Sequence, residues 1–175
     1  VIEVMEHGGG PLELIEDAGE AALSDDVLFA RLYPDLRRFA AVVASADTDP
    51  DDLVQEAVSR ALRKGPLLRF ENPGAYLRRS IVNLAANERR RLGRGRRAKA
   101  RAGAGESERP ADYPSDLADL LRLPPDARAA VWLVDVEGWD FEAVARLLGC
   151  SPEAARARAS RARKTLRRTI EEETR

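Results

Sequence analysis

Apolar residues recur at intervals of three or four along most of the chain, the periodicity of amphipathic helices. The first such pattern covers residues 23–43 and contains Pro34, which we expect to kink the helix or split it in two. No strand pattern of useful length is found, so the sequence predicts an all-α protein. The apolar positions of the first helix are Val27, Leu28, Leu32, Leu36, Phe39, Ala40 and Val43.

A second helix is predicted to begin near Asp51 and to end before Gly65-Pro66, with acids in its first turn and bases in its last, as the helix dipole favours. Its apolar stripe leaves a polar face exposed. By residue type alone, exposed acids and amides most often serve solubility, and a partner-binding surface is the alternative. The residues of this face are Asp52, Gln55, Glu56, Ser59 and Arg63.

A third helix is predicted from Pro73 to Leu92, with Asn72 as its N-cap. One face carries an aromatic ring, two amides and several guanidinium groups, which can stack on bases, pair with base edges and hold phosphates. A merely solvated face is the alternative; the basic run that follows favours nucleic acid. The candidate residues are Tyr76, Arg79, Asn83, Asn87, Arg90 and Arg91.

The C-terminal part predicts a helix-turn-helix. Pro125 starts one helix, Asp140 caps a second, and Ser151-Pro152-Glu153 opens a third after a turn at Gly149. The third helix is rich in Arg, as expected of a recognition helix in the major groove; snorkelling Arg side chains on an amphipathic helix are the alternative. Its candidate DNA contacts are Arg156, Arg158, Ser160, Arg161 and Arg163. Trp132 and Trp139 are expected to pack this small domain.

These patterns divide the chain into two helical domains joined by a flexible linker. We expect an acidic extension over residues 1–22, an N-terminal domain over 23–93, a linker over 94–115, a helix-turn-helix domain over 116–170 and a tail over 171–175.

The formal net charge of −1 conceals a strong segregation of charge. Residues 1–26 carry acids and no Lys or Arg, whereas residues 63–101 and 150–168 are strongly basic. Local charge, rather than the sum, determines where nucleic acid can bind. With 1 His and 1 Cys, we expect no intrachain disulfide, no metal site and no cofactor. The same counts remove most hydrolytic triads, so an enzyme would have to work through carboxylates, Lys or Arg. No membrane span or secretory signal is recognisable, and the Cys usage fits a reducing cytoplasm.

Taken in order, these motifs resemble an extracytoplasmic-function (ECF) sigma factor of bacterial RNA polymerase. The resemblance rests on Asp-Asp-Leu-Val-Gln-Glu-Ala at residues 51–57, the Tyr/Asn/Arg helix and the C-terminal helix-turn-helix, and it covers about residues 25–168. It implies a region-2 bundle and a region-4 helix-turn-helix that recognise the −10 and −35 promoter elements. The chain departs from the family pattern at Tyr76, where Trp is common, and at Asn87, where Asp is frequent.

The resemblance also implies partners and site residues. Asp52, Gln55 and Glu56 would contact the β′ clamp helices of core RNA polymerase, and the C-terminal domain would meet the β flap. The six polar residues of the third helix would bind −10 DNA, and the polar residues of the last helix, together with Ala157, would bind −35 DNA. An anti-sigma factor would hold the protein inactive, and the chain would not be an enzyme by itself. Two other hypotheses remain: a stand-alone helix-turn-helix repressor, and a degenerate sigma-like protein that acts only through protein contacts.

Overall fold

The computed structural model describes residues 24–101 and 121–173, and every regular element in these two ranges is helical. The all-α prediction is therefore confirmed. The predicted acidic extension and most of the predicted linker lie outside the described residues. The elements are α1 (Asp25–Val43), α2 (Pro50–Leu62), the short 3-10 helix η1 (Leu67–Arg69), α3 (Pro73–Arg101), α5 (Pro125–Asp135), α6 (Phe141–Leu148) and α7 (Pro152–Glu173).

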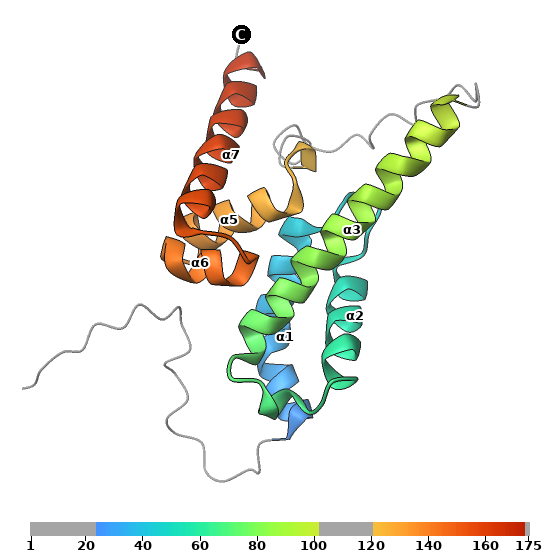
Figure 1. The fold of residues 1–175 in the computed structure, drawn as a ribbon, viewed down its shortest axis with the longest axis vertical. Helices are drawn as coiled ribbons and strands as arrows, with labels where there is room; N and C mark the ends of the chain where they lie inside the picture. The colour runs from blue at the N-terminus through green and yellow to red at the C-terminus, as the bar shows by residue number, and fades with distance from the viewer. Residues whose placement is uncertain (1–23, 102–120, 174–175) are drawn as a thin grey trace, which may run out of the picture.

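Helices α1, α2 and α3 pack against one another and form the N-terminal module (Figure 1). Each is preceded by a capping residue whose side chain accepts a backbone N–H: Ser24 from Val27, Asp49 from Asp51, and Asn72 from Ala75. Such caps satisfy amide groups that have no partner within the helix. The buried centre of the module comprises Leu36, Phe39, Val43, Val54, Ala57, Leu77 and Ile81.

Two helix boundaries differ from those predicted. Pro34 lies inside α1, which runs as one helix from Asp25 to Val43 and is not split in two. Helix α3 continues to Arg101 through Gly93 and Gly95, so the first eight residues of the predicted linker are helical. Two Gly residues disfavour a helix by about 1 kcal/mol each, and the surrounding Ala, Arg, Lys and Leu residues, all good helix formers, oppose that effect.

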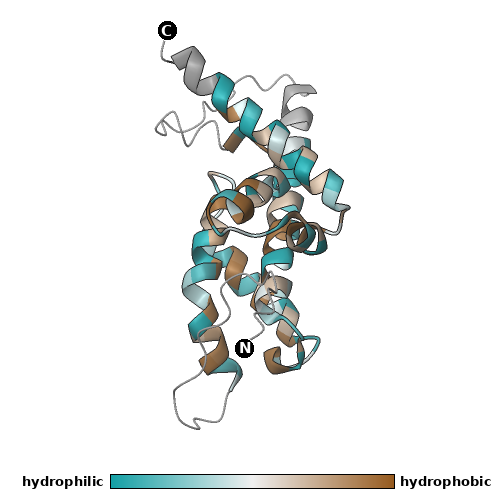
Figure 2. Ribbon diagram, turned by 90° about the vertical axis from the view of Figure 1, so that its left-hand side faces the viewer, coloured by the Kyte–Doolittle hydropathy of each residue, from teal (hydrophilic) through white to brown (hydrophobic). Residues whose placement is uncertain are grey.

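Helices α5, α6 and α7 form the C-terminal module, in which α6, a tight turn and α7 make the predicted helix-turn-helix. Asp140 caps α6, and Ser151 accepts the backbone N–H of Ala154 in the first turn of α7. The turn depends on Gly149, which has a φ of 66°, a left-handed conformation that suits glycine. The coloured turns of helix α7 are mostly hydrophilic (Figure 2).

The two modules pack against each other rather than standing apart. Helix α5 contacts both α1 and α3, and α6 contacts α3 (Figure 1). One continuous cluster of buried residues runs from Leu36 in α1 to Ala159 in α7. None of the described helices has the length and apolarity needed to cross a membrane.

Candidate nucleic-acid and polymerase-binding surfaces

The polar face of α2 is the candidate polymerase-binding surface. Asp52 and Gln55 are exposed on it, and Glu56 is partly buried. Glu56 accepts a hydrogen bond of 2.6 Å from Nε of Arg60, and this bond lowers the pKa of the Glu56 carboxyl. The structure therefore brings the three predicted residues together, with Glu56 already paired and the other two turned outward.

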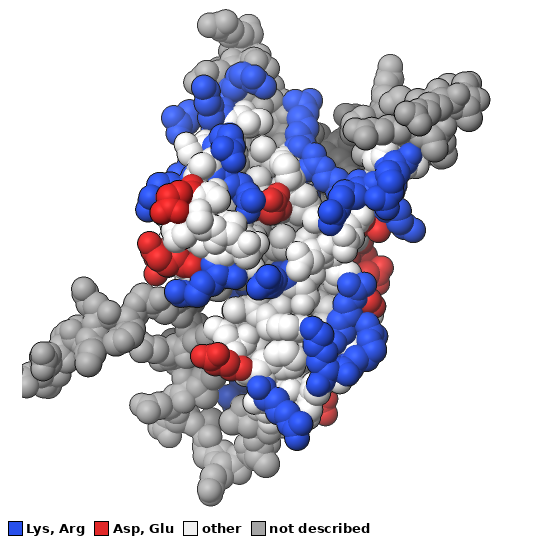
Figure 3. All heavy atoms as spheres, viewed as in Figure 1, with Lys and Arg blue, Asp and Glu red and all other residues white. Residues whose placement is uncertain are grey.

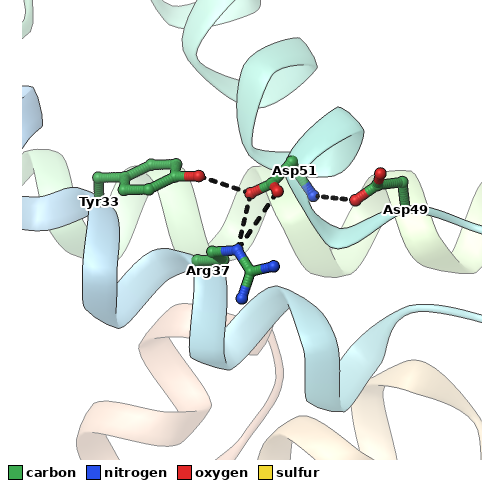
Figure 4. Close-up of polar contacts among 4 residues, drawn as sticks. All are labelled: Tyr33, Arg37, Asp49 and Asp51. Carbon is green, nitrogen blue, oxygen red and sulfur yellow. Dashed lines mark hydrogen bonds and ion pairs between the residues drawn. The ribbon is translucent and has the colours of Figure 1, made fainter.

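The start of α2 is fixed to α1 by Asp51 (Figure 4). The hydroxyl of Tyr33 donates to the Asp51 carboxylate over 2.7 Å, and Nε of Arg37 donates to it over 3.1 Å. The hydrogen bond from Tyr33, reinforced by Arg37, lowers the pKa of Asp51. This network positions α2, and helical periodicity could not predict it because Tyr33 and Asp51 are 18 residues apart.

The candidate DNA-binding face of α3 is a row of exposed polar residues spaced by three or four positions, which ends in an adjacent pair of Arg residues. Its members are Arg79, Asn83, Asn87, Arg90 and Arg91, all exposed as predicted. Residues spaced by three or four lie on one side of a helix. Within the row, Arg90 donates a hydrogen bond of 2.7 Å to the side-chain oxygen of Asn87.

Tyr76, the sixth predicted residue of α3, is only partly exposed. Its ring lies 4.3 Å from that of Phe70, centroid to centroid, and Nζ of Lys64 lies 5.4 Å from its centre. The loop that carries Phe70 is held by Asp25 in α1, whose carboxylate accepts the backbone N–H groups of Leu67 and Leu68. The aromatic pair therefore joins an anchored loop, which carries Phe70, to the first turn of α3, which carries Tyr76.

Two surface hollows flank the row on α3. One lies between α3 and the C-terminal module, and the other lies on the side of α2. The first is lined by Arg79, Asn83, Arg89 and Arg90 from α3 together with Asp126, Leu147, Leu148 and Arg158 from the C-terminal module. The second is lined by Arg60, Leu84, Asn87, Glu88, Arg90, Arg91 and Arg94.

The predicted contacts on α7 fall into two groups. Arg156, Ser160 and Arg161 are exposed, and the guanidinium of Arg156 lies 5.1 Å from the centre of the Phe141 ring. Arg158 and Arg163 instead form ion pairs with Asp126 and Asp135 of α5, at 3.2 and 2.6 Å. Ala157, which follows Arg156 in the sequence, is partly buried and belongs to neither group.

Lys164 and Arg167 extend the exposed face of α7 toward its C-terminus and were not among the predicted contacts. Their spacing from Ser160, by four and seven residues, could have identified them. Basic side chains gather over α7 and over the upper part of α3 in the view of Figure 3. Such a distribution suits a polyanion bound to both helices.

The sequences of both modules match models of one known protein family. Residues 28–95 match the family described as Sigma-70 region 2, and residues 120–166 match Sigma-70, region 4. The chain belongs to the sigma-70 family, whose members direct transcription initiation. Relatives described as ECF RNA polymerase sigma factors place it among the ECF sigma factors of that family.

Two relatives and one solved structure illustrate the similarity. The chain is 33% identical over 155 residues to the ECF RNA polymerase sigma factor SigM of Mycobacterium tuberculosis, covering 83% of this chain and 76% of that protein. It is 34% identical over 172 residues to the RNA polymerase sigma factor CarQ of Myxococcus xanthus, covering 92% and 96%. The sigma factor RpoE from Bartonella quintana, in complex with the anti-sigma factor NepR, superposes with a TM-score of 0.63 at 27% identity, covering 83% and 96%.

Proposed function

We propose that this sigma factor uses three separate surfaces for three steps of initiation. The polar face of α2 binds core RNA polymerase, α7 binds the −35 element, and α3 binds and opens the −10 element. The observation that carries this proposal is the exposed row on α3, in which two successive amides are flanked by guanidinium groups, in the segment that matches region 2.

The row on α3 combines the chemistry needed to separate strands. An amide can pair with the edge of an unstacked base, and a guanidinium can hold the neighbouring phosphate. Phe70 and Tyr76 provide aromatic surface next to the row, on which an extruded base can stack. Asn83 and Asn87 are therefore assigned to base recognition and Arg79, Arg90 and Arg91 to phosphates.

On α7 the exposed residues Arg156, Ser160 and Arg161 are assigned to DNA contact, and Lys164 extends the phosphate-binding face. An exposed Arg near the start of a recognition helix can bridge the two acceptors of guanine. Arg158 and Arg163 are assigned to holding α7 on α5, since carboxylates already occupy their guanidinium groups. The small side chains of Ala157 and Ser160 favour readout through phosphates and DNA shape.

Each of these surfaces also suggests a partner of the sigma factor. Asp52, Gln55 and Glu56 would meet the β′ clamp helices, and the C-terminal module would meet the β flap. A Bartonella relative is bound by an anti-sigma factor, which supports a similar regulator here. The protein would act in the cytoplasm, where polymerase is, and we assign no catalytic step to the chain itself.

Run-off transcription with core polymerase and a promoter library tests the function. The expected result is initiation from a limited set of promoters that share both elements. A repressor acting alone would bind duplex DNA tightly and leave polymerase unaffected, and it would not account for the match to region 2. A degenerate sigma would bind core polymerase and open no promoter.

A further inference from the structure

The amide of Asn87, in the row on α3, is bound by a neighbouring side chain. Nη2 of Arg90 donates a hydrogen bond of 2.7 Å to Oδ1 of Asn87, and Nε of Arg90 donates one of 3.3 Å to the backbone carbonyl of Ala86. Residues three positions apart on a helix are neighbours, so the helix itself brings the guanidinium to the amide. Arg90 is therefore held by the backbone of α3 through Nε while it binds Asn87 through Nη2.

This hydrogen bond determines which way the Asn87 amide faces. An amide carries an acceptor oxygen and a donor NH2 group, whereas a guanidinium carries only donors. The oxygen of Asn87 must therefore lie toward Arg90, and the NH2 group lies on the other side of the amide. Turning the amide over would place donor against donor and lose the bond. The orientation of Asn87 is thus fixed before any base binds.

The surroundings of Asn87 leave its NH2 group available. Asn87 and Arg90 line the hollow on the α2 side of the row, and Glu88 is the only acid among the described residues that line it. Arg91 donates to Glu88 over 2.8 Å, so this carboxylate already has a partner. Within the described parts of the chain the NH2 group of Asn87 has no acceptor, and the side chain is exposed. The amide therefore presents a free donor in a fixed direction.

Asn83, one turn earlier in the same row, differs from Asn87 in this respect. Its side chain is also exposed, and no hydrogen bond orients its amide among the residues that the structure describes. The amide of Asn83 can turn to suit the base that it meets. Only one of the two amides in the row is therefore oriented in advance.

Orientation matters because the pairing edges of the bases differ in the order of donor and acceptor. Adenine and cytosine carry an amino donor beside a ring-nitrogen acceptor, whereas guanine and thymine carry a carbonyl acceptor beside a ring N–H donor. An amide that is free to turn matches either class, because turning exchanges its own donor and acceptor. An amide that cannot turn matches one class and opposes the other.

We propose that Arg90 makes Asn87 selective between amino bases (adenine and cytosine) and carbonyl bases (guanine and thymine) at one position of the −10 element. The inference rests on the proposed function of α3 and adds a role to the assignment of Arg90 to phosphates. The two roles are compatible, because a guanidinium has more N–H groups than the bonds to Asn87 and Ala86 use. Arg90 acts through Asn87 and is thus a positioning residue, and a base of the wrong class requires its bond to the amide to break.

Binding of single-stranded −10 oligonucleotides to the full-length sigma factor assembled with core polymerase tests the proposal. At each position in turn, uracil is compared with cytosine and hypoxanthine with adenine, since each pair keeps the ring size and exchanges a carbonyl group for an amino group. Single strands remove the contribution of duplex melting to the affinities. Asn87→Ala locates the position that Asn87 reads, because its loss should change the ratio of the two affinities there.

At that position the wild-type affinities for the two bases of a pair should differ about tenfold, the ratio that corresponds to one hydrogen bond. Arg90→Ala should abolish this difference, because the amide can then turn. Arg90→Lys should keep most of it, since an ammonium group also donates to the amide oxygen. Asn87→Asp should favour the amino base with or without Arg90, because a carboxylate offers acceptors on both sides.

Arg91→Ala is the matched control for Arg90→Ala. Arg91 is the next exposed Arg of the row and pairs with Glu88 rather than with an amide, so its loss should weaken binding of all oligonucleotides by one factor and keep the ratio. The same uniform loss in a folded Arg90→Ala protein would show that Arg90 only holds phosphate and would overturn the proposal. If circular dichroism shows that Arg90→Ala is unfolded, Arg90→Met, which keeps the length of the side chain and removes every donor, is measured by the same criterion.

The role of Arg90 and the proposed function of α3 fail in different ways. A base preference that is lost in Asn87→Ala but kept in Arg90→Ala would refute the role of Arg90 and leave Asn87 as a base reader. If Asn87→Ala changes the ratio at no position, Asn87 does not read a base, and both its proposed function and the role of Arg90 are refuted together.

Discussion

The guanidinium of Arg163 forms two hydrogen bonds with the carboxylate of Asp135, at 2.6 and 2.9 Å. This pair joins the recognition helix α7 to α5. Because its guanidinium is occupied by Asp135, Arg163 is not a free DNA contact. The hydrogen bonding of the Arg163 guanidinium to the Asp135 carboxylate raises the pKa of Arg163. Arg161, two residues earlier, is exposed, so neighbouring Arg residues of one helix have different surroundings.

Arg163→Ala is therefore expected to destabilise the C-terminal module by roughly 0.5–1 kcal/mol, the range of a well-oriented pair near the surface. A double-mutant cycle with Asp135→Ala in urea unfolding measures the coupling. The matched substitution Arg161→Ala should leave stability unchanged and weaken duplex −35 binding. Additive effects of the Arg163 and Asp135 substitutions would show that the pair contributes nothing to stability.

Asn83→Ala is expected to weaken discrimination at one −10 base by about 1–3 kcal/mol, because the amide is assigned to the edge of a single base. The measurement is transcription from promoters that carry each base at each −10 position. Gln55→Ala serves as the control and should lower activity equally on all promoters. An equal loss across promoters with Asn83→Ala would assign Asn83 to phosphate binding or folding instead.

Asp52→Asn is expected to weaken binding to core polymerase by about 1–2 kcal/mol, or roughly five- to thirtyfold, as for a contributing residue of an interface. Asp47→Asn removes an equivalent carboxylate from the exposed turn before α2 and is the matched control. Fluorescence anisotropy of labelled sigma factor with core enzyme measures both. Equal affinities for the two variants would remove Asp52 from the interface.

The sequence predicted the features that depend on neighbouring residues. The caps at Asn72, Asp140 and Ser151 act over three residues, and each helix begins where these caps indicate. The exposed row on α3 was predicted because helical spacing alone determines which residues share a face.

The contacts between distant parts of the chain could not be predicted in this way. Arg128 bonds to carbonyls 84 and 85 residues away, and nothing in its local pattern distinguishes it from an exposed Arg. The same holds for the pairing of Arg163 with Asp135 across 28 residues. Packing of the two modules, and the loss of Arg158 and Arg163 as free contacts, depend on tertiary structure.

Asp25 of α1 holds the loop before α3, and a substitution at Asp25 tests whether this contact is needed for promoter opening. Asp25 accepts hydrogen bonds of 2.9 and 3.1 Å from the backbone of Leu67 and Leu68, just before Phe70. Asp25→Ala should destabilise the N-terminal module by roughly 1–2 kcal/mol and reduce promoter opening, measured by permanganate reactivity, with core binding retained. Asp26→Ala is the control, because Asp26 shares the first turn of α1 and is exposed. Equal loss of promoter opening in both variants would show that the acids act through the dipole of α1 and not through the hydrogen bonds of Asp25 to the loop.

Acid should weaken the attachment of α2 to α1. The hydrogen bond from Tyr33, assisted by Arg37, holds the pKa of Asp51 below its ordinary value of about 4. Since the folded-state pKa is the lower one, the unfolded chain takes up the proton first. The stabilisation is thus fully present above the unfolded pKa and is lost as the pH falls through the folded one.

Urea midpoints of the wild-type protein should therefore decrease from pH 5 downward, and Asp51→Asn should flatten that decrease. Tyr33→Phe removes the largest cause of the shift and should flatten it in part. A wild-type slope retained by Asp51→Asn would assign the acid sensitivity to other carboxyls, of which Glu56, whose pKa Arg60 lowers, is the next to test.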